Sequence, residues 1–224
     1  MRDLTNIMII FVVLFSACEV PKNKTVNKTN PCFCENDSLI NQYTVSCDTT
    51  ILSNGAKLYW QFNCDKIWYT LENKDGKQSI LDTIPIELYP YTYRLGFHLI
   101  KEFEKRILFR SGCPANGPCI YTLIDKNTGQ KIKEFNQLIS IEKEDEKYLF
   151  DFIVYLSDTS DELVIYFVDK DKTLLVPFNE NLTFPQNQFI EMSLNNTILT
   201  LNFELDDKTK KSLNINLDDK KYIR

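Results

Sequence analysis

The amino-acid sequence predicts a mainly β protein whose antiparallel hairpins form a sandwich or an open barrel. Residues typical of strands are abundant, since the 224-residue chain is 43% hydrophobic and 12% aromatic, with 15 Phe and 11 Tyr. Aromatic and β-branched side chains favour the pleated, half-buried surface of a sheet. The apolar segments are also short and are separated by turn residues, which is the pattern of hairpins rather than of long helices.

Four pairs of apolar segments flank short turns rich in Asn, Asp, Lys and Gly. In the first pair the Asp75-Gly76 step is a strong hairpin signal, because glycine readily adopts the positive φ of tight turns. A further strand is expected over 57–63, where polar and apolar residues alternate. The predicted hairpins comprise residues 66–72 with 77–84, 119–125 with 130–135, 162–169 with 173–178 and 198–205 with 212–217.

The similarity of these hairpins suggests an internal repeat. Tyr69, Tyr121 and Tyr166 hold related places before three of the turns, and their spacing is close to the period of roughly 40–50 residues found in propeller blades. A small or partial propeller is therefore the alternative fold. The sandwich or open barrel is preferred, because it uses the same hairpins without circular closure.

One segment, residues 98–110, fits two structures. Leu99, Phe103 and Arg106-Ile107 suit a short helix, whereas the run from Ile107 to Phe109 suits a buried strand.

The amino terminus has the order of a secretory signal peptide over residues 1–17. A polar start with one Arg precedes an apolar run over 7–15, and small residues follow. That run is shorter than the ~20 residues a membrane-spanning helix needs, and no later segment approaches this length. Residues 18–31 are polar and predict a flexible tether. Residues 32–224 are interpreted as a single β-rich domain.

The stretch Phe15-Ser16-Ala17-Cys18 resembles the lipobox of bacterial lipoproteins. The resemblance implies that Cys18 becomes the first mature residue and carries acyl chains, so that the membrane is a partner through a lipid anchor. Glu19 is not the Asp that marks inner-membrane retention, which favours the outer membrane within the cell envelope. A plain signal peptide cut near Ala17 is the alternative.

The body of the chain resembles a group of uncharacterised bacterial lipoproteins. The resemblance rests on Trp68-Tyr69-Thr70-Leu71-Glu72-Asn73 and on the Ile107-Leu108-Phe109 strand before Ser111-Gly112-Cys113. It implies no particular activity.

Seven cysteines agree with export and lipidation. With Cys18 set aside, an even number remains, which in an exported chain predicts disulfides. Cys113 and Cys119 flank a turn-rich loop and are the favoured pair, while Cys32 and Cys34 are each expected to reach Cys47 or Cys64. No metal site is predicted, because Cys32 and Cys34 lack ligand spacing and the chain has one His. No cofactor is predicted either.

Catalytic signals are weak. His98 is the single histidine, and Glu102 would orient it if this stretch were helical, but no nucleophile motif accompanies them. The segment from Asp125 to Gly129 faintly resembles a calcium loop, yet the same residues suit a hairpin turn, which is the favoured interpretation.

Aromatic side chains give the strongest binding signal. Exposed Trp and Tyr make contact platforms for sugars or proteins, although neighbours on a strand point to opposite faces, so one of each adjacent pair is expected in the core. The net charge of −5 and pI of about 5.1 argue against nucleic acid as a partner. The candidate patch consists of Tyr59, Trp60, Trp68, Tyr69, Tyr91 and Tyr93.

The leading hypothesis is a non-enzymatic, membrane-tethered β domain that binds a ligand or partner, either an envelope protein or a glycan. One alternative is a carboxylate-based hydrolase of envelope or extracellular polymers. Another is a structural assembly component of the envelope. Converging acids in a cleft would favour the hydrolase, an exposed aromatic patch beside the Cys113–Cys119 loop would favour the binding protein, and a long uncovered strand edge would favour assembly.

Overall fold

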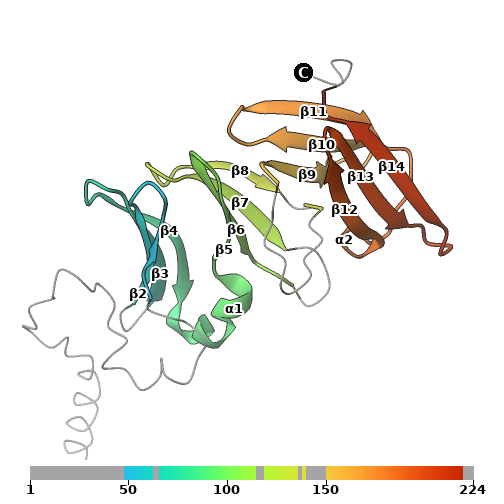
Figure 1. Cartoon of the computed structure of the whole chain (residues 1–224). Coiled ribbons are helices and arrows are strands. Elements are labelled where there is room, and N and C mark those ends of the chain that lie inside the picture. Colours follow the sequence, from blue (N-terminus) through green and yellow to red (C-terminus); the bar gives the residue numbers. More distant parts are fainter. Residues whose placement is uncertain (1–47, 63–65, 115–118, 136–137, 140–149, 219–224) are drawn as a thin grey trace, which may run out of the picture.

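Four antiparallel sheets follow one another along the chain (Figure 1). The computed structural model describes residues 48–62, 66–114, 119–135, 138–139 and 150–218. The prediction of a mainly β protein built from antiparallel hairpins is confirmed, and all four predicted hairpins are present. Within the described residues none of the sheets closes into a barrel.

Each sheet is a meander of three or four strands paired in chain order. The first sheet contains β1 (Thr50–Ile51), β2 (Lys57–Phe62), β3 (Lys66–Glu72) and β4 (Gln78–Pro85). The second contains β5 (His98–Glu102), β6 (Arg106–Ser111), β7 (Ile120–Asp125) and β8 (Lys131–Phe135). The third contains β9 (Phe152–Leu156), β10 (Glu162–Phe167) and β11 (Lys172–Pro177). The fourth contains β12 (Phe189–Asn195), β13 (Ile198–Glu204) and β14 (Lys210–Asn216).

The short helices lie between sheets. A 3-10 helix, η3 (Ile86–Tyr91), continues directly into α1 (Thr92–Leu95) and joins the first sheet to the second. Another short helix, α2 (Pro185–Gln188), follows the third sheet and leads into β12 of the fourth. No helix among the described residues is long and apolar enough to cross a membrane.

Successive sheets pack face to face, and three apolar clusters fill the spaces between them. Tyr69 of the first sheet packs with Phe109 of the second, Leu123 of the second lies in one cluster with Ile153 of the third, and Ile165 of the third shares a cluster with Leu201 of the fourth. Every neighbouring pair of sheets is thus a two-layer sandwich. In Figure 1 the first and last sheets stand at opposite ends of the row, so the described sheets stack in order without closing a ring.

The tyrosine repeat is only partly matched by the packing. Tyr69 and Tyr121 both face the sheet that follows their own. Tyr166 faces the preceding sheet, where its ring lies 6.4 Å from that of Phe135. Because side chains alternate along a strand, a one-residue shift is enough to reverse the face. The sequence spacing therefore overstated the equivalence of the third hairpin.

The ambiguous segment 98–110 is a hairpin, so the helical interpretation is wrong. β5 and β6 pair through a tight turn in which the Phe103 N–H donates to the Arg106 carbonyl over 2.9 Å. The Asp169 carboxylate accepts from the N–H groups of Glu104 and Lys105, each over 3.2 Å. This turn lacks Gly and Pro, and its stabilising partner comes from the third sheet, which explains why local sequence did not reveal it.

The turns of the first two sheets meet around a buried lysine. Lys126 is 2% exposed, and its ammonium donates to Ser53 Oγ (2.9 Å), Glu102 Oε1 (2.8 Å) and the Phe103 carbonyl (3.0 Å). Ser53 also donates to Glu102 through its N–H and its hydroxyl. We call this region the turn end of the contact between the first two sheets. The opposite, helical end holds η3, α1 and the β6–β7 loop.

Candidate binding surface

The structure divides the predicted aromatic patch among three environments. Tyr59 and Tyr69 are buried, at 1% and 7% exposure. Trp60 is half-buried against Tyr69, with ring centroids 4.6 Å apart, because these two are cross-strand partners that face the second sheet. Trp68 lies on the other face, where its indole N–H donates to Gln61 Oε1 over 3.0 Å. These four side chains do not share one exposed surface.

Tyr91 and Tyr93 stay exposed, and they have apolar neighbours on the helical connection. Tyr91 is 50% exposed and Tyr93 52%, while Leu88 and Leu95 are each 38% exposed. All four belong to the ten-residue stretch of η3 and α1. We call the set Leu88, Tyr91, Tyr93, Arg94 and Leu95 the tyrosine surface.

Gly96, at the end of α1, allows the helical connection to pack closely against the first sheet. The Gly96 N–H closes α1 by donating to the Thr92 carbonyl over 2.9 Å. A Cβ at Gly96 would lie 2.9 Å from the Trp60 ring and 3.1 Å from Ile84 Cδ1. Only glycine therefore allows α1 and the first sheet to come this close. Within α1 the Thr92 side chain is buried, whereas Tyr91 and Tyr93 on either side of it remain exposed.

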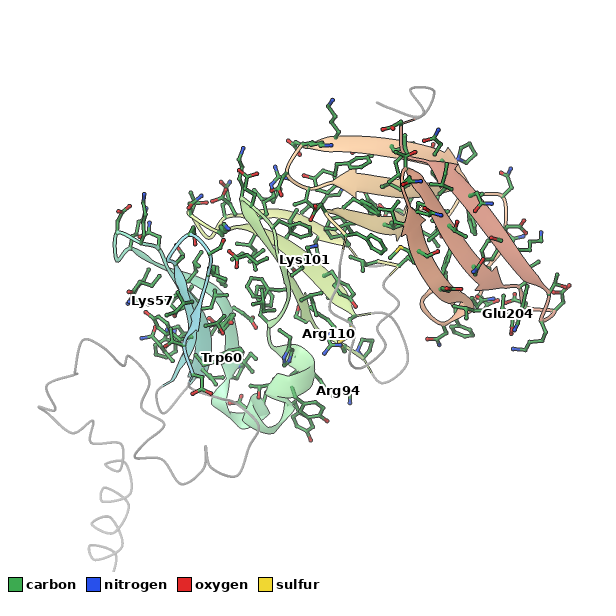
Figure 2. The ribbon with its side chains drawn as sticks, in the orientation of Figure 1. Lys57, Trp60, Arg94, Lys101, Arg110 and Glu204 are labelled. Carbon is green, nitrogen blue, oxygen red and sulfur yellow. A yellow bond between two sulfur atoms is a disulfide. The ribbon has the colours of Figure 1, made fainter. Side chains whose placement is uncertain are left out.

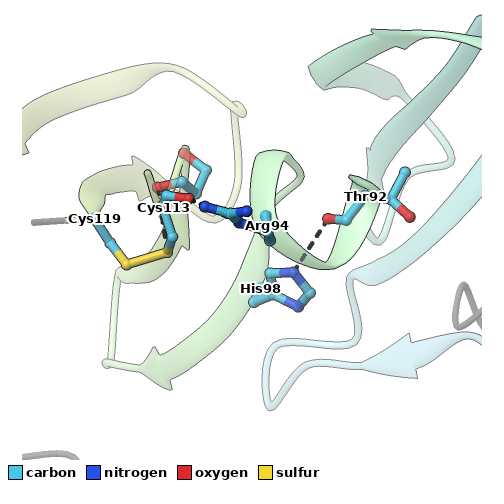
Figure 3. The surroundings of a disulfide bond; sticks show 6 residues. Thr92, Arg94, His98, Cys113 and Cys119 are labelled. Atoms are coloured by element: carbon cyan, nitrogen blue, oxygen red, sulfur yellow. Dashed lines mark hydrogen bonds between the residues drawn. A yellow bond between two sulfur atoms is a disulfide. The ribbon is translucent and has the colours of Figure 1, made fainter. Parts of the chain in front are cut away.

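The predicted Cys113–Cys119 pair forms a disulfide, with an S–S distance of 2.06 Å (Figure 3). The adjoining backbone is attached to α1: the Cys113 N–H donates to the Arg94 carbonyl over 2.9 Å, and the Gly112 N–H to the Leu95 carbonyl over 3.3 Å. In return, Arg94 Nε donates to the Cys113 carbonyl over 3.2 Å. The tyrosine surface is thus fastened beside a disulfide-braced loop. The other cysteine predictions, at Cys18, Cys32, Cys34, Cys47 and Cys64, lie outside the described residues.

His98 lies behind the tyrosine surface, in β5. Its Nε2 is 3.3 Å from the Thr92 carbonyl (Figure 3). Burial lowers the pKa of the imidazole, and the Arg110 cation lowers it further, which outweighs the contacts with the backbone of Thr92 and Tyr93. Glu102, which the sequence suggested as an orienting partner, instead pairs with Lys126 at the turn end.

One acidic group at the helical end is poorly satisfied. Burial raises the pKa of the Asp82 carboxyl, against the lowering effect of backbone hydrogen bonds from Thr83 and Phe97. Its Oδ2 is buried and has no hydrogen-bond partner among the described residues. An unsatisfied buried oxygen costs folding free energy, and a functional role is one of the explanations for keeping it.

The faint calcium-loop pattern is a hairpin turn, as favoured from sequence. Asp125 Oδ1 accepts from the N–H groups of Asn127 (3.0 Å) and Thr128 (2.9 Å) and from the Thr128 hydroxyl (2.9 Å). These bonds direct the carboxylate to its own backbone. Across the part of the chain that the structure describes, no group of three or more His, Cys, Asp or Glu side chains could hold a metal ion.

Carboxylates also line a pocket of about 290 Å³ on the fourth sheet, beside α2, Phe184 and Ile190. Asp206 accepts from Thr183 Oγ1 (2.7 Å) and Gln188 Nε2 (2.8 Å), and these bonds lower the pKa of its carboxyl. Glu204 pairs with Lys208 over 3.0 Å. A glycosidase needs one carboxyl whose pKa is raised so that it can donate a proton. Asp206, with its lowered pKa, therefore does not supply the proton-donating carboxyl that the hydrolase hypothesis requires.

Sequence reasoning missed Leu88, Arg94 and Leu95. Leu88, Tyr91 and Leu95 are spaced three and four residues apart, the pattern of one helical face. Attention to that spacing would have added Leu88 and Leu95 to Tyr91, but it gives no signal for Arg94. Comparison of the chain with protein-family models and with curated protein sequences finds no match.

Proposed function

We propose that this chain is a membrane-tethered domain of the bacterial cell envelope whose tyrosine surface binds a partner protein. The observation that carries the proposal is the exposure of two Tyr and two Leu side chains on a helical connection fastened to a disulfide-braced loop. The role is binding rather than catalysis.

The composition of the surface suits protein recognition. Tyr, Trp and Arg are enriched among the residues that contribute most binding free energy at interfaces. Tyr offers a large contact area with few rotatable bonds, and Arg offers a planar guanidinium with several hydrogen-bond donors. The backbone bonds from Gly112 and Cys113 to α1 hold the segment in place before a partner arrives. Such preorganisation lowers the entropy cost of association.

A protein partner is favoured over a glycan by the two leucines. Leu88 and Leu95 are each 38% exposed, and burying aliphatic carbon gains free energy only against another apolar group. A sugar would present hydroxyl groups to them, which would lose water without gaining hydrogen bonds. Tyr91 and Tyr93 alone would suit either class of ligand.

The tether and lipid are supported by the sequence: the signal-like residues 1–17, Cys18 and the polar segment 18–31. The intact mass of the protein from its own membranes tests this part. A chain that begins at Cys18 and is heavier by acyl groups agrees with the anchor, whereas an unmodified chain cut elsewhere excludes it.

Site-specific photo-cross-linking in intact cells tests the binding surface. A benzoylphenylalanine would replace Tyr91 or Tyr93, with Ser212 on β14 as the control position, because Ser212 is exposed on the last sheet. The proposal predicts one discrete, protease-sensitive adduct of the same mass from both tyrosine positions and none from Ser212. Leu95→Glu should abolish it, because a charge would enter the apolar contact.

Two outcomes would contradict the proposal. Equal adduct formation at Ser212 would mean that contact is nonspecific. An adduct that survives protease but is removed by glycan cleavage would assign the tyrosine surface to a polysaccharide.

A further inference from the structure

Arg94 is the charged member of the tyrosine surface, and its side chain is oriented by the loop that carries the disulfide. Its Nε donates to the Cys113 carbonyl over 3.2 Å (Figure 3). This bond uses one edge of the planar guanidinium. Among the described residues the two terminal nitrogens have no hydrogen-bond or ion-pair partner.

A second arginine lies at the same end of the second sheet as Arg94, although the chain as a whole is acidic and the buried Asp82 carboxyl is also at this end. The net charge is −5, yet Arg94 and Arg110 both lie toward the α1 end of the second sheet (Figure 2). Arg110 is close enough to His98 to lower the pKa of that imidazole. Within residues 86–95 the single acid is Glu87 at the start of η3, and no salt bridge joins it to Arg94.

A guanidinium held through Nε, with both terminal nitrogens available, matches a carboxylate, because its parallel N–H groups can bind both carboxylate oxygens at once. We infer that the partner presents an acidic side chain to Arg94, so that the tyrosine surface takes a protein segment that combines apolar and acidic residues. This inference rests on the proposed function and names the chemistry of its partner.

Tyrosine and leucine neighbours strengthen the expected contact. Tyr91 and Tyr93 beside Arg94 displace water when a segment docks, and removal of water increases the strength of the charge-assisted bond. The net charge of −5 disfavours the approach of acidic segments to the chain in general. An acidic partner therefore depends on a local cation such as Arg94.

The test uses the full-length lipoprotein in detergent and three fluorescein-labelled peptides. The peptides share the same spacing of Leu residues and differ at the intervening polar positions, which are Glu, Gln or Lys. Fluorescence anisotropy at low and high salt gives the dissociation constants. The Glu peptide should bind about tenfold more tightly than the Gln peptide, as expected for one charge-assisted pair, and salt should reduce this preference.

Variants separate the charge from the apolar contact. Arg94→Gln should remove the preference for Glu over Gln while leaving binding of the Gln peptide unchanged. Tyr93→Ser should weaken both peptides by the same factor. Lys210→Gln, which removes an exposed positive charge on β14, should change neither constant.

The outcomes distinguish this inference from the proposed function. If the Glu and Gln peptides bind equally and Tyr93→Ser still weakens the binding of both, the inference of an acidic partner is wrong, while the proposed protein-binding surface stands. Failure of all three peptides to bind counts against both. Displacement of the Glu peptide more readily by polygalacturonate than by polyglutamate would assign Arg94 to an acidic glycan and overturn the inference. Self-association that depends on Arg94 would instead identify a second copy as the source of the acid.

Discussion

The two ends of the contact between the first and second sheets are built on opposite principles. At the turn end, Lys126 is buried and makes three hydrogen bonds, one of them to the Glu102 carboxylate. At the helical end, Tyr91 and Tyr93 are half exposed, and Asp82 has a buried oxygen without a partner among the described residues. A satisfied polar cluster stabilises the fold, whereas exposed apolar groups and unsatisfied oxygens are costs that a binding function explains.

This difference separates stability from binding along one interface. Substitutions at the turn end should lower the free energy of unfolding without a direct effect on recognition. Those at the tyrosine surface should impair recognition with little effect on unfolding, since surface substitutions usually change stability by less than about 0.5 kcal/mol.

The largest effect is expected for Lys126→Met. Removing one partner of a buried ion pair leaves the other charge uncompensated, which costs about 3 kcal/mol; Glu102 would then keep only its bonds from Ser53. The matched control is Lys57→Met, which breaks a 2.9 Å pair with Glu72 at a lysine whose side chain is 48% exposed and should cost under about 1 kcal/mol. Urea denaturation at pH 7 measures both, and equal losses would contradict a special role for the turn end.

A glycine pair isolates steric fit at the same end. Gly129 and Gly76 both have positive φ, +74° and +79°, but a Cβ at Gly129 would lie 2.6 Å from Ser79 Cβ, while at Gly76 nothing lies within 4 Å. Gly76→Ala should cost about 1 kcal/mol for the left-handed backbone, and Gly129→Ala about 2 kcal/mol, because crowding adds to it. If the two variants unfold at the same denaturant concentration, the contact between these turns is looser than the structure shows.

At the helical end, the double variant Cys113→Ser, Cys119→Ser opens a short loop, because the two cysteines are only six positions apart in the sequence. Loss of the cross-link should cost about 2 kcal/mol by the chain-entropy relation. It should also weaken the cross-linking reaction at Tyr93, because α1 bonds to the loop backbone. Thermal unfolding and adduct yield measure the two effects, and a fall in stability without any fall in adduct yield would show that the loop does not position the surface.

The sequence predicted those features of the two ends that depend on residues close together in the chain, and not those that depend on distant residues. The four hairpins and the Cys113–Cys119 pair follow from turn residues and short spacing, and both are confirmed. The hydrogen bonds of Lys126 at the turn end were not predicted, because its partners Ser53 and Glu102 lie far away in sequence.

The aromatic patch illustrates the same limit. Alternation along a strand correctly implied that some members of the patch belong to the core, as Tyr69 does. It could not show that Tyr91 and Tyr93 leave the sheet on a helical connection, because that depends on the close approach of Gly96 to Trp60. Contacts between separate sheets, rather than local pattern, decide which aromatic residues remain exposed.

The smallest expected effect is a difference in how the two ends respond to acid. The pKa of His98 is lowered by burial and by Arg110, so the folded state binds this proton less readily than the unfolded state. The pKa of Glu102 is also lowered: burial acts to raise it, but hydrogen bonds from Lys126 and Ser53 outweigh burial. For a lowered pKa, stability is present above the unfolded value and is lost as pH falls toward the folded one.

The two pH windows therefore differ, because the unfolded pKa is about 6.5 for His and about 4.3 for Glu. His98→Gln should reduce the loss of stability that begins as pH falls below about 6.5, while Glu102→Gln, though less stable at pH 7, should reduce the further loss below about pH 4.3. Urea midpoints across this range measure both slopes. If both variants flatten the same window, the two ends are coupled through the sheets, and the separation of a stabilising end from a binding end fails.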